Sequence, residues 1–398
     1  MVLIVILYKN AMMIFRKFNY LVFIFPHFLV SCNAQETNNN KEHLPYVPQI
    51  IQSIDTSPGW IQTGQKLMLT GNIYLPDGKS PAKDVIIYYY HTNTEGRYLH
   101  KPGQKRSMAP NELGQTHGYI RGWVKTDSLG RYAIYTVRPG TYPTRDFPAH
   151  LHATITEPGN KKEYYIDDFV FDDDKLLTSA YRKKMENRGG TGTVRLVKKE
   201  DVFVGERNII LGLNIPNYAD KGKDVIVSGR NAGEDILSFT PFHAWGADKG
   251  GKACPICKYG WYHGILYFVG NNPVWDEVYT WLSFLDKESE KREKYLKVYF
   301  IYGNSENYSK QQREKELERI GEKLKLAHVA LTFVPSFSDE ESEVNMNKID
   351  QYVENTFLIY KRSRIIDKYT NMKPVEENFR RISATLDETI NEYFYLTK

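Results

Sequence analysis

Short stretches of alternating apolar and polar residues fill the first half of the chain, between residues 59 and 213. Because side chains on a β-strand point alternately to opposite faces, a period of two predicts strands with one buried face. Turn-forming residues separate these stretches, for example at residues 76–78 and 127–130. The predicted strands are residues 66–75, 85–90, 119–125, 132–137, 149–156, 164–171, 193–198 and 208–213. Several short strands joined by turns predict an all-β sandwich or barrel.

The periodicity changes after a segment rich in glycine, aspartate and lysine, residues 214–234, which we interpret as a linker. Beyond it, helical spacing alternates with short apolar runs. The predicted strands are residues 264–269, 295–301, 329–334, 356–360 and 364–369, and the predicted helices are residues 274–289, 309–326 and 375–394. This order predicts an α/β domain over residues 235–398. The chain is therefore expected to be multidomain, with an all-β sandwich followed by an α/β domain.

The amino terminus has the pattern of an export signal. Basic residues precede an apolar run at residues 21–30, which is too short for a confident membrane span. The run closes in Leu-Val-Ser-Cys32, which is typical of a bacterial lipobox. We therefore predict a lipoprotein signal peptide over residues 1–32, lipidation at Cys32 and a tether over residues 33–58. The protein would be exported and lipid-anchored to a bacterial membrane in the cell envelope. An uncleaved anchor or a plain secretory signal is the alternative.

The charge of the chain is small once this leader is set aside. The formal net charge is +5, and residues 1–31 carry three basic and no acidic side chains, which leaves 5 − 3 = +2. Domains that bind nucleic acid usually carry a pronounced basic surface. We therefore expect no nucleic-acid partner.

Two tyrosines and two histidines form the most informative cluster in the sequence: Tyr98, Tyr142, His150 and His152. Residues i and i+2 of a strand share a face, so His150 and His152 can hold one metal ion together. A tyrosinate is a hard anionic ligand, and its pKa falls beside a strongly Lewis-acidic ion. Two phenolates and two imidazoles suit ferric iron better than zinc, which predicts an Fe(III) cofactor. A single one of the 29 tyrosines, or a lone His-x-His, would more often serve packing or the surface.

Segments around these four residues resemble one known family, the intradiol ring-cleavage dioxygenases. They are residues 96–98 (Gly-Arg-Tyr), 121–127 (Arg-Gly-Trp-Val-Lys-Thr-Asp), 130–132 (Gly-Arg-Tyr), 136–143 (Thr-Val-Arg-Pro-Gly-Thr-Tyr-Pro) and 148–152 (Pro-Ala-His-Leu-His). The family comprises the catechol, hydroxyquinol and protocatechuate dioxygenases. The resemblance implies a β-sandwich over residues 59–213 that holds non-haem ferric iron.

The resemblance also implies a role for each of the four residues. Tyr98 would be the equatorial tyrosinate and Tyr142 the axial one, while His150 would be the axial imidazole and His152 the equatorial one. Tyr142 would also be catalytic, because an axial phenolate can be displaced by a catechol-type substrate and accept its proton as it leaves. Reaction with dioxygen between the two hydroxylated carbons would give a muconate-type diacid.

One position departs from the family pattern. The family usually has an arginine directly before Pro-Ala-His, where it steadies negative charge on the ring, and this chain has Phe147 there. Arg145 is the candidate catalytic residue that would reach the same space, and its alternative is a solvated loop charge. Tyr90 stands where the family carries an aromatic wall residue, although it could equally be sandwich core. Tyr90 and Phe147 are therefore the predicted substrate-binding residues.

The order of elements in residues 235–398 resembles the thioredoxin-like fold. Cys254-Pro-Ile-Cys257 looks like a redox pair, but it precedes the first predicted strand of this domain instead of following it. Three interpretations stay open for Cys254 and Cys257: a structural disulfide, a dithiol redox pair, or a metal site with His243 or His263.

The leading prediction is a non-haem Fe(III) intradiol dioxygenase, an oxidoreductase of aromatic catabolism that uses a catecholic substrate and O2. One rival is an envelope thiol-disulfide oxidoreductase that uses Cys254 and Cys257. The other is a non-catalytic surface lipoprotein that binds iron or catecholates. The ring substituents, the membrane face and the formation of a homo-oligomer stay open.

Overall fold

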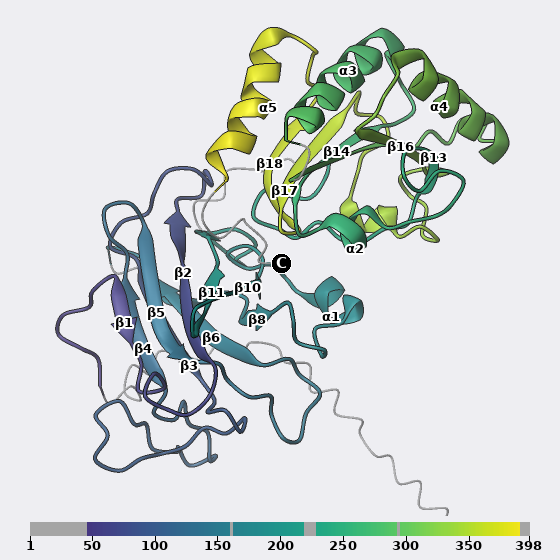
Figure 1. Cartoon of the computed structure of the whole chain (residues 1–398). Coiled ribbons are helices and arrows are strands. Elements are labelled where there is room, and N and C mark those ends of the chain that lie inside the picture. The colour runs from purple at the N-terminus through teal and green to yellow at the C-terminus, as the bar shows by residue number, and fades with distance from the viewer. Residues whose placement is uncertain (1–45, 160–161, 219–227, 293–294, 391–398) are drawn as a thin grey trace, which may run out of the picture. The chain divides into compact units, whose positions relative to one another are not determined.

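Alternating side chains build two β-sheets between residues 54 and 210 (Figure 1). The first sheet has the order β1 (Ile54–Thr56), β5 (Arg131–Val137), β2 (Lys66–Tyr74), β11 (Val202–Glu206) and β10 (Leu196–Lys199), with β12 (Ile209–Ile210) also paired to β2. The second has the order β4 (Arg121–Lys125), β3 (Ile86–His91), β6 (His150–Thr156), β8 (Phe169–Phe171) and β9 (Thr193–Val194), with β7 (Tyr164–Tyr165) also paired to β6. A short helix, α1 (Ser179–Lys184), connects β8 and β9.

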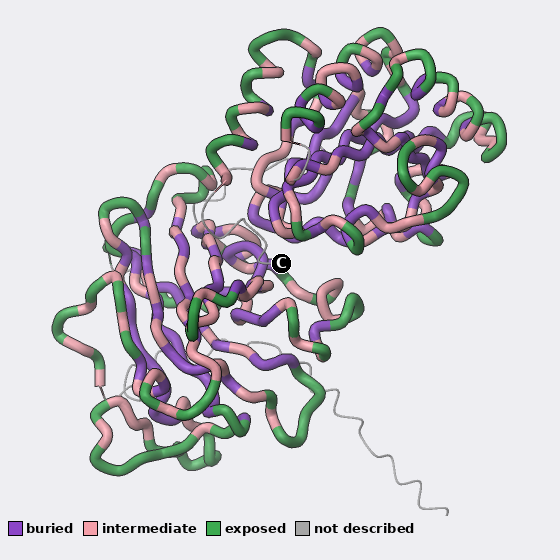
Figure 2. Tube along the Cα trace, viewed as in Figure 1, coloured by how far each residue is buried: buried purple, intermediate pink, exposed green. Residues whose placement is uncertain are grey.

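The two sheets share one hydrophobic core, which confirms the predicted sandwich. Leu67 and Leu69 of β2 in the first sheet and Leu151 and Ile155 of β6 in the second are fully buried in it. Figure 2 shows the same alternation of buried and less buried residues along the strands. Because successive side chains of β6 alternate, His150 and the other residues of its parity project from the face opposite this core.

The structure is a computed structural model that describes residues 46–159, 162–218, 228–292 and 295–390. The predicted signal peptide with Cys32, and the tether up to residue 45, lie outside the described residues. Within the part that is described, no helix combines the length and the apolar character that a membrane span requires.

A third sheet and its helices occupy residues 242–388. The sheet has the order β13 (Phe242–Trp245), β16 (Val329–Phe333), β15 (Leu296–Tyr302), β14 (His263–Val269), β17 (Thr356–Lys361) and β18 (Arg364–Thr370). The helices are α2 (Pro255–Tyr259), α3 (Trp275–Lys291), α4 (Lys310–Leu324) and α5 (Glu376–Glu388), with a 3-10 turn η2 (Val344–Asn347). The strands β14, β15 and β16 run parallel, and β17 is antiparallel to β14.

Both faces of this third sheet are covered. Helices α3, α4 and α5 contribute Trp281, Leu317 and Ile382 to the core on one face. Ile256 of α2 and Phe337 pack on the other face. All seven residues of β14 are consequently buried. The region combines a mixed sheet with helices, as the sequence predicts, while its thioredoxin-like assignment stays a prediction.

Several segments differ from the sequence-based expectation, among them β11, β13, α1 and α2, which the sequence analysis did not predict. Residues 54–56, which we placed in the tether, form β1 and pair in parallel with β5. A strand of three residues is too short to give a detectable alternation. The predicted strand 164–171 is divided into β7 and β8, which leaves residue 168 in the connection between them. At the described end of the predicted linker, the Gly233 backbone N–H donates to the Ile365 carbonyl at 2.8 Å.

Candidate metal centre

Strand β6 supplies two imidazoles on the outer face of the second sheet. It is a central strand, paired with β3 on one side and with β7 and β8 on the other. His150 and His152 are both half-buried, and their ring centroids lie 4.6 Å apart. Pairing on both edges fixes the backbone, so the two rings are held side by side.

Two tyrosines from separate loops meet these imidazoles. The Tyr142 hydroxyl lies 3.1 Å from His150 Nε2 and 3.3 Å from His152 Nε2. The Tyr98 hydroxyl lies 3.0 Å from the Tyr142 hydroxyl. The structure therefore brings together all four residues that the sequence nominated as metal ligands.

The far nitrogen of each imidazole is engaged by the protein. His150 Nδ1 lies 2.7 Å from the Pro148 carbonyl oxygen, and His152 Nδ1 lies 2.8 Å from Asp168 Oδ1. Both partners are acceptors, so each Nδ1 carries the proton and donates it. Burial lowers the pKa of His150, which favours the neutral ring with a lone pair on Nε2. Neutral imidazoles with Nε2 directed at one point are the form that binds a metal ion.

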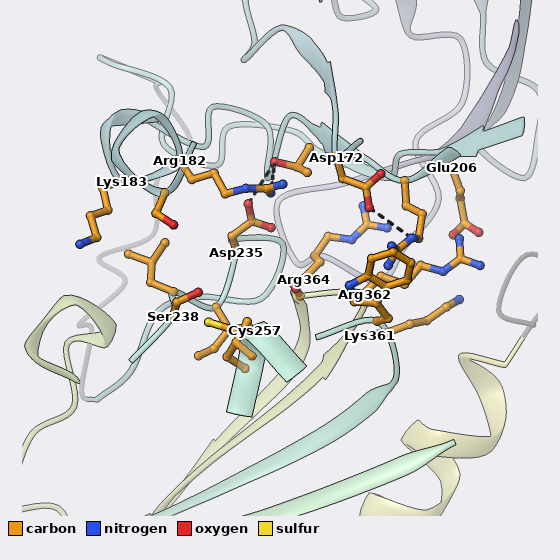
Figure 3. A pocket seen from close by; sticks show the side chains of 18 residues that line it. Asp172, Arg182, Lys183, Glu206, Asp235, Ser238, Cys257, Lys361, Arg362 and Arg364 are labelled. Atoms are coloured by element: carbon orange, nitrogen blue, oxygen red, sulfur yellow. Dashed lines mark hydrogen bonds and ion pairs between the residues drawn. The ribbon is translucent and has the colours of Figure 1, made fainter. Parts of the chain in front are cut away.

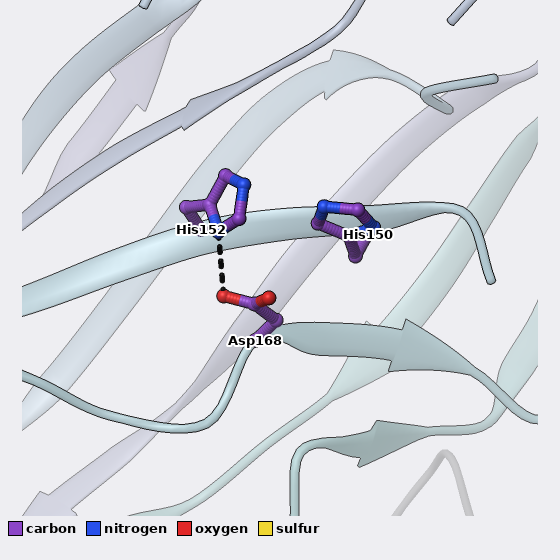
Figure 4. A group of neighbouring side chains, drawn as sticks. All are labelled: His150, His152 and Asp168. Carbon is purple, nitrogen blue, oxygen red and sulfur yellow. Dashed lines mark hydrogen bonds and ion pairs between the residues drawn. The ribbon is translucent and has the colours of Figure 1, made fainter. Parts of the chain in front are cut away.

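Asp168 is a site residue that sequence reasoning missed. It lies in the connection between β7 and β8, directly before Phe169, and Figure 4 shows its carboxylate directed at His152. His150, His152 and Asp168 have potential ligand atoms within 4.8 Å of one another. Burial raises the pKa of the Asp168 carboxyl, but the facing His152 imidazole outweighs this, so that its pKa lies below the usual value. A lone aspartate before a short strand carries no sequence signal.

We assign Asp168 to the support of His152 because its Oδ1 atom already accepts the His152 Nδ1 proton. A carboxylate in this position fixes the orientation of the ring and makes Nε2 a stronger electron donor.

The donor set fits a strongly charged cation. Burial, followed by the neighbouring Tyr142 hydroxyl, raises the pKa of Tyr98 far above its ordinary value. A buried phenol of this kind becomes a phenolate only beside a strong positive charge. A trivalent ion bound by Tyr98, Tyr142, His150 and His152 would supply that charge, and the hard oxygen and imidazole donors match ferric iron.

Tyr90 forms an aromatic wall beside these residues. It is 8% exposed, and its ring centroid lies 4.7 Å from that of His152. On its other side it stacks on His117 at 3.7 Å. His117 Nδ1 is bonded to the Tyr88 hydroxyl at 2.7 Å, and burial lowers the pKa of His117 to about 4. Tyr90 is buried, but it pairs with His152 across β3 and β6 and so lies on the sheet face opposite the shared core. This position does not favour the core alternative, and the substrate-binding role of Tyr90 stays a prediction.

The structure does not place Arg145 in the interior of the site. Arg145 is exposed in the loop between Tyr142 and His150. Phe147 is 41% exposed and meets Tyr181 edge to face at 6.4 Å. The catalytic role of Arg145 and the substrate-binding role of Phe147 stay predictions, and the position of Arg145 favours the solvated loop charge.

The two cysteines of the second half are joined to each other. Cys254 and Cys257 form a disulfide across the first turn of α2. Their sulfurs are then not available as ligands, and His263 Nε2 is bonded to the Thr389 hydroxyl at 2.8 Å. This arrangement argues against the metal interpretation and leaves the structural and the redox interpretations.

Comparison with known proteins shows that the first half of the chain is similar to dioxygenases. Residues 50–201 match the family model described as Dioxygenase. The chain is 26% identical over 179 residues to the protocatechuate 3,4-dioxygenase beta chain of Burkholderia cepacia, an alignment that covers 42% of this chain and 67% of the relative.

Three of the solved structures that match have lower identities and low TM-scores. A dioxygenase domain from Streptomyces sp. SirexAA-E is 17% identical, with 42% of this chain and 92% of that chain covered and a TM-score of 0.31. The 3-chlorocatechol 1,2-dioxygenase of Rhodococcus opacus 1CP is 19% identical, with 42% and 68% covered and a TM-score of 0.30. An intradiol ring-cleavage dioxygenase of Tetranychus urticae is 21% identical, with 42% and 89% covered and a TM-score of 0.29.

The family-model match and the curated relative confirm the resemblance that the sequence motifs indicated. The first half of the chain is an intradiol dioxygenase-like domain, and the proteins that it matches are oxidoreductases that cleave aromatic rings.

Proposed function

We propose that this chain is an Fe(III)-dependent intradiol dioxygenase that cleaves a catechol-type ring between its two hydroxylated carbons with O2. The observation that carries the proposal is the convergence of the Tyr98 and Tyr142 hydroxyls with the Nε2 atoms of His150 and His152. A structural role for these residues would not require two imidazoles with their Nε2 atoms directed at one half-buried phenol.

Ferric iron bound at this point would hold both oxygens of a catechol and act as a Lewis acid toward the ring. Tyr98 and the two histidines would keep the ion in place, with His152 fixed in turn by Asp168. Tyr142 would hold the proton that the substrate gives up. Its oxygen lies within 3.3 Å of three of the other donors, so it occupies the centre of the cluster.

We infer that the substrate ring is uncharged near Tyr90. The wall on this side consists of the Tyr90 ring and the His117 ring that is stacked on it. Because burial keeps the pKa of His117 at about 4, this imidazole is neutral at pH 7. An aromatic, neutral wall favours an apolar ring edge over a carboxylated one. Catechol and hydroxyquinol are therefore better first substrates than protocatechuate.

The test of the proposal is oxygen uptake by the iron-loaded chain with catechol or hydroxyquinol, together with mass spectrometry of the diacid product. Tyr142→Phe should lower kcat by about 100-fold or more, because it removes the proton acceptor. Tyr352→Phe is the matched control, because Tyr352 is 68% exposed. If catechol changes the visible absorption of the protein but no oxygen is consumed, the chain is a binding protein and the proposal fails.

The proposal for cellular location rests on the sequence alone. We propose that the chain is exported and acylated at Cys32, which lies outside the described residues. Mass spectrometry of the protein from bacterial membranes should then show an acylated amino-terminal cysteine, and Cys32→Ser should release the protein into the soluble fraction. An unmodified Cys32 would contradict this proposal and would leave the iron site unaffected.

A further inference from the structure

A second site is formed by a cavity of ≈ 290 Å³, which is distinct from the metal centre (Figure 3). Its wall comes from α1, from β9 and the end of β11, from residues 235–238, from α2, and from the end of β17 with the turn into β18. The basic side chains that line it are Arg182, Lys183, Arg195, Lys361, Arg362 and Arg364, and the acidic ones are Asp172, Glu206 and Asp235. Six positive and three negative groups leave 6 − 3 = +3 charges in the lining.

Arg362 is a basic side chain in this wall whose hydrogen-bond donors are not all used. It opens the turn between β17 and β18, where its φ of 52° is in the left-handed region. Its Nε and Nη2 atoms are buried, and neither has a hydrogen-bond partner among the described residues. Burial lowers the pKa of its guanidinium group below the usual value. A half-buried guanidinium with two buried, unused donors is costly unless a ligand or water completes it.

The neighbouring cations are held in place by protein partners. Arg195 lies 3.2 Å from Asp172 Oδ2 and over the ring of Trp261. Arg182 Nη1 donates to the Thr193 hydroxyl at 3.2 Å. These contacts fix the positive side chains around Arg362 before any ligand arrives, which reduces the ordering cost of binding.

The lining also holds Arg364, whose Nη1 donates to the Asn208 carbonyl at 3.3 Å, and Lys361, whose Nζ donates to the Thr389 carbonyl at 2.7 Å. Burial lowers the pKa of Lys361 to about 8. An anion in the cavity would favour the protonated form of this lysine.

One acceptor in the cavity is also unused. Asp235 Oδ1 is buried without a hydrogen-bond partner in the described part of the chain, and burial raises the pKa of this carboxyl. A ligand that carries a hydroxyl group could donate to this oxygen while its anionic oxygens meet Arg362. Hydrogen phosphate and hydroxy acids share this combination of groups.

We propose that the cavity binds a small oxyanion, a phosphate or a carboxylate, through the free Nε and Nη2 donors of Arg362. The planar guanidinium fork matches the spacing of two oxygens on either group. The volume of ≈ 290 Å³ is large enough for a small anion and its water. The site requires no iron and does not depend on the proposed dioxygenase activity.

The test is isothermal titration calorimetry of the full, metal-free chain with inorganic phosphate and, separately, with malate. Metal is left out because ferric ions bind phosphate themselves. We expect one saturable site, with affinity lowered about 10- to 100-fold in Arg362→Gln, because a charge-assisted pair of hydrogen bonds is lost. Arg380→Gln is the matched control, since Arg380 is exposed and pairs only with Glu376 on the surface of α5 among the described residues.

Each result decides the question. Binding of phosphate alone assigns the site to phosphates, binding of malate alone assigns it to carboxylates, and binding of both supports the shared oxyanion chemistry. An absence of saturable heat with either anion overturns the proposal, as does equal affinity in Arg362→Gln and Arg380→Gln. If Arg362→Gln does not fold, Arg182→Gln on α1 should weaken binding in the same direction, and unchanged affinity there overturns the proposal.

Discussion

Strands β6 and β14 are both central strands that carry histidine, but their histidines do different things. In β6, His150 and His152 lie on a half-buried face and keep Nε2 directed at Tyr142. In β14, His263 is 1% exposed, its Nε2 is bonded to the Thr389 hydroxyl, and burial lowers its pKa to about 3. A histidine becomes a candidate ligand when only its far nitrogen is engaged and a second donor faces the near one.

The same contrast extends to the two halves of the chain. The first half keeps a group of polar donors on the sheet face that is not used for its core. The second half covers both faces of its sheet, so that its strands serve packing. Substitutions should therefore affect iron binding in the first half and the free energy of unfolding in the second.

The largest effect is expected for His150→Ala, which removes one imidazole from the group of four. Iron affinity should fall by more than about 100-fold, since even the loss of an outer-shell partner costs 10- to 100-fold. Metal content after dialysis and competition with a chelator measure this. His100→Ala, at an exposed position, should bind iron as the wild type does. If His150→Ala and His100→Ala retain iron equally, His150 is not a ligand, and the histidines of β6 no longer differ in function from His263 of β14.

Leu282→Ala should have the next largest effect, on stability alone. Leu282 is fully buried on α3, and truncation of such a leucine costs about 2–5 kcal/mol in the free energy of unfolding. Urea unfolding measures this cost, and Lys287→Ala on the exposed face of α3 is the control. Iron affinity under native conditions should not change. If Leu282→Ala lowers iron affinity as His150→Ala does, iron binding does not depend on the first half alone, and the contrast between the two halves is wrong.

Asp168→Asn should weaken iron binding about 10- to 100-fold, which is less than the loss of a ligand. The amide cannot accept the His152 Nδ1 proton as strongly as the carboxylate does, so the orientation of the ring is less well fixed. Chelator competition compares it with Asp201→Asn, an exposed aspartate. An affinity loss as large as that of His150→Ala would instead make Asp168 a direct ligand.

Much of this site could be predicted from the sequence, and the reasons for the misses are physical. His150 and His152 were predictable because strand alternation places i and i+2 together, and the tyrosines because their flanking motifs resemble a known family. Asp168 was missed because its role depends on the division of one predicted strand into β7 and β8. Arg145 was nominated from its position in the sequence; it is exposed in the loop before β6, and its catalytic role stays a prediction.

A separate effect is a pH dependence of stability in the second half. Burial lowers the pKa of His263 to about 3, against about 6.5 in the unfolded chain. Between these values the unfolded chain binds one more proton, so stability falls as pH decreases, by about 1.4 kcal/mol per pH unit. Urea unfolding from pH 7 to pH 4 should show a shallower slope in His263→Gln. An unchanged slope would mean that His263 is protonated in the folded protein.

The most direct test of the central claim is the visible absorption of the full chain loaded with Fe(III). Two tyrosinates on one ferric ion should give a reddish charge-transfer colour that weakens in Tyr98→Phe and in Tyr142→Phe and persists in Tyr352→Phe. A protein that binds Fe(III) without colour, or whose colour survives both substitutions, would contradict a centre built from Tyr98, Tyr142, His150 and His152.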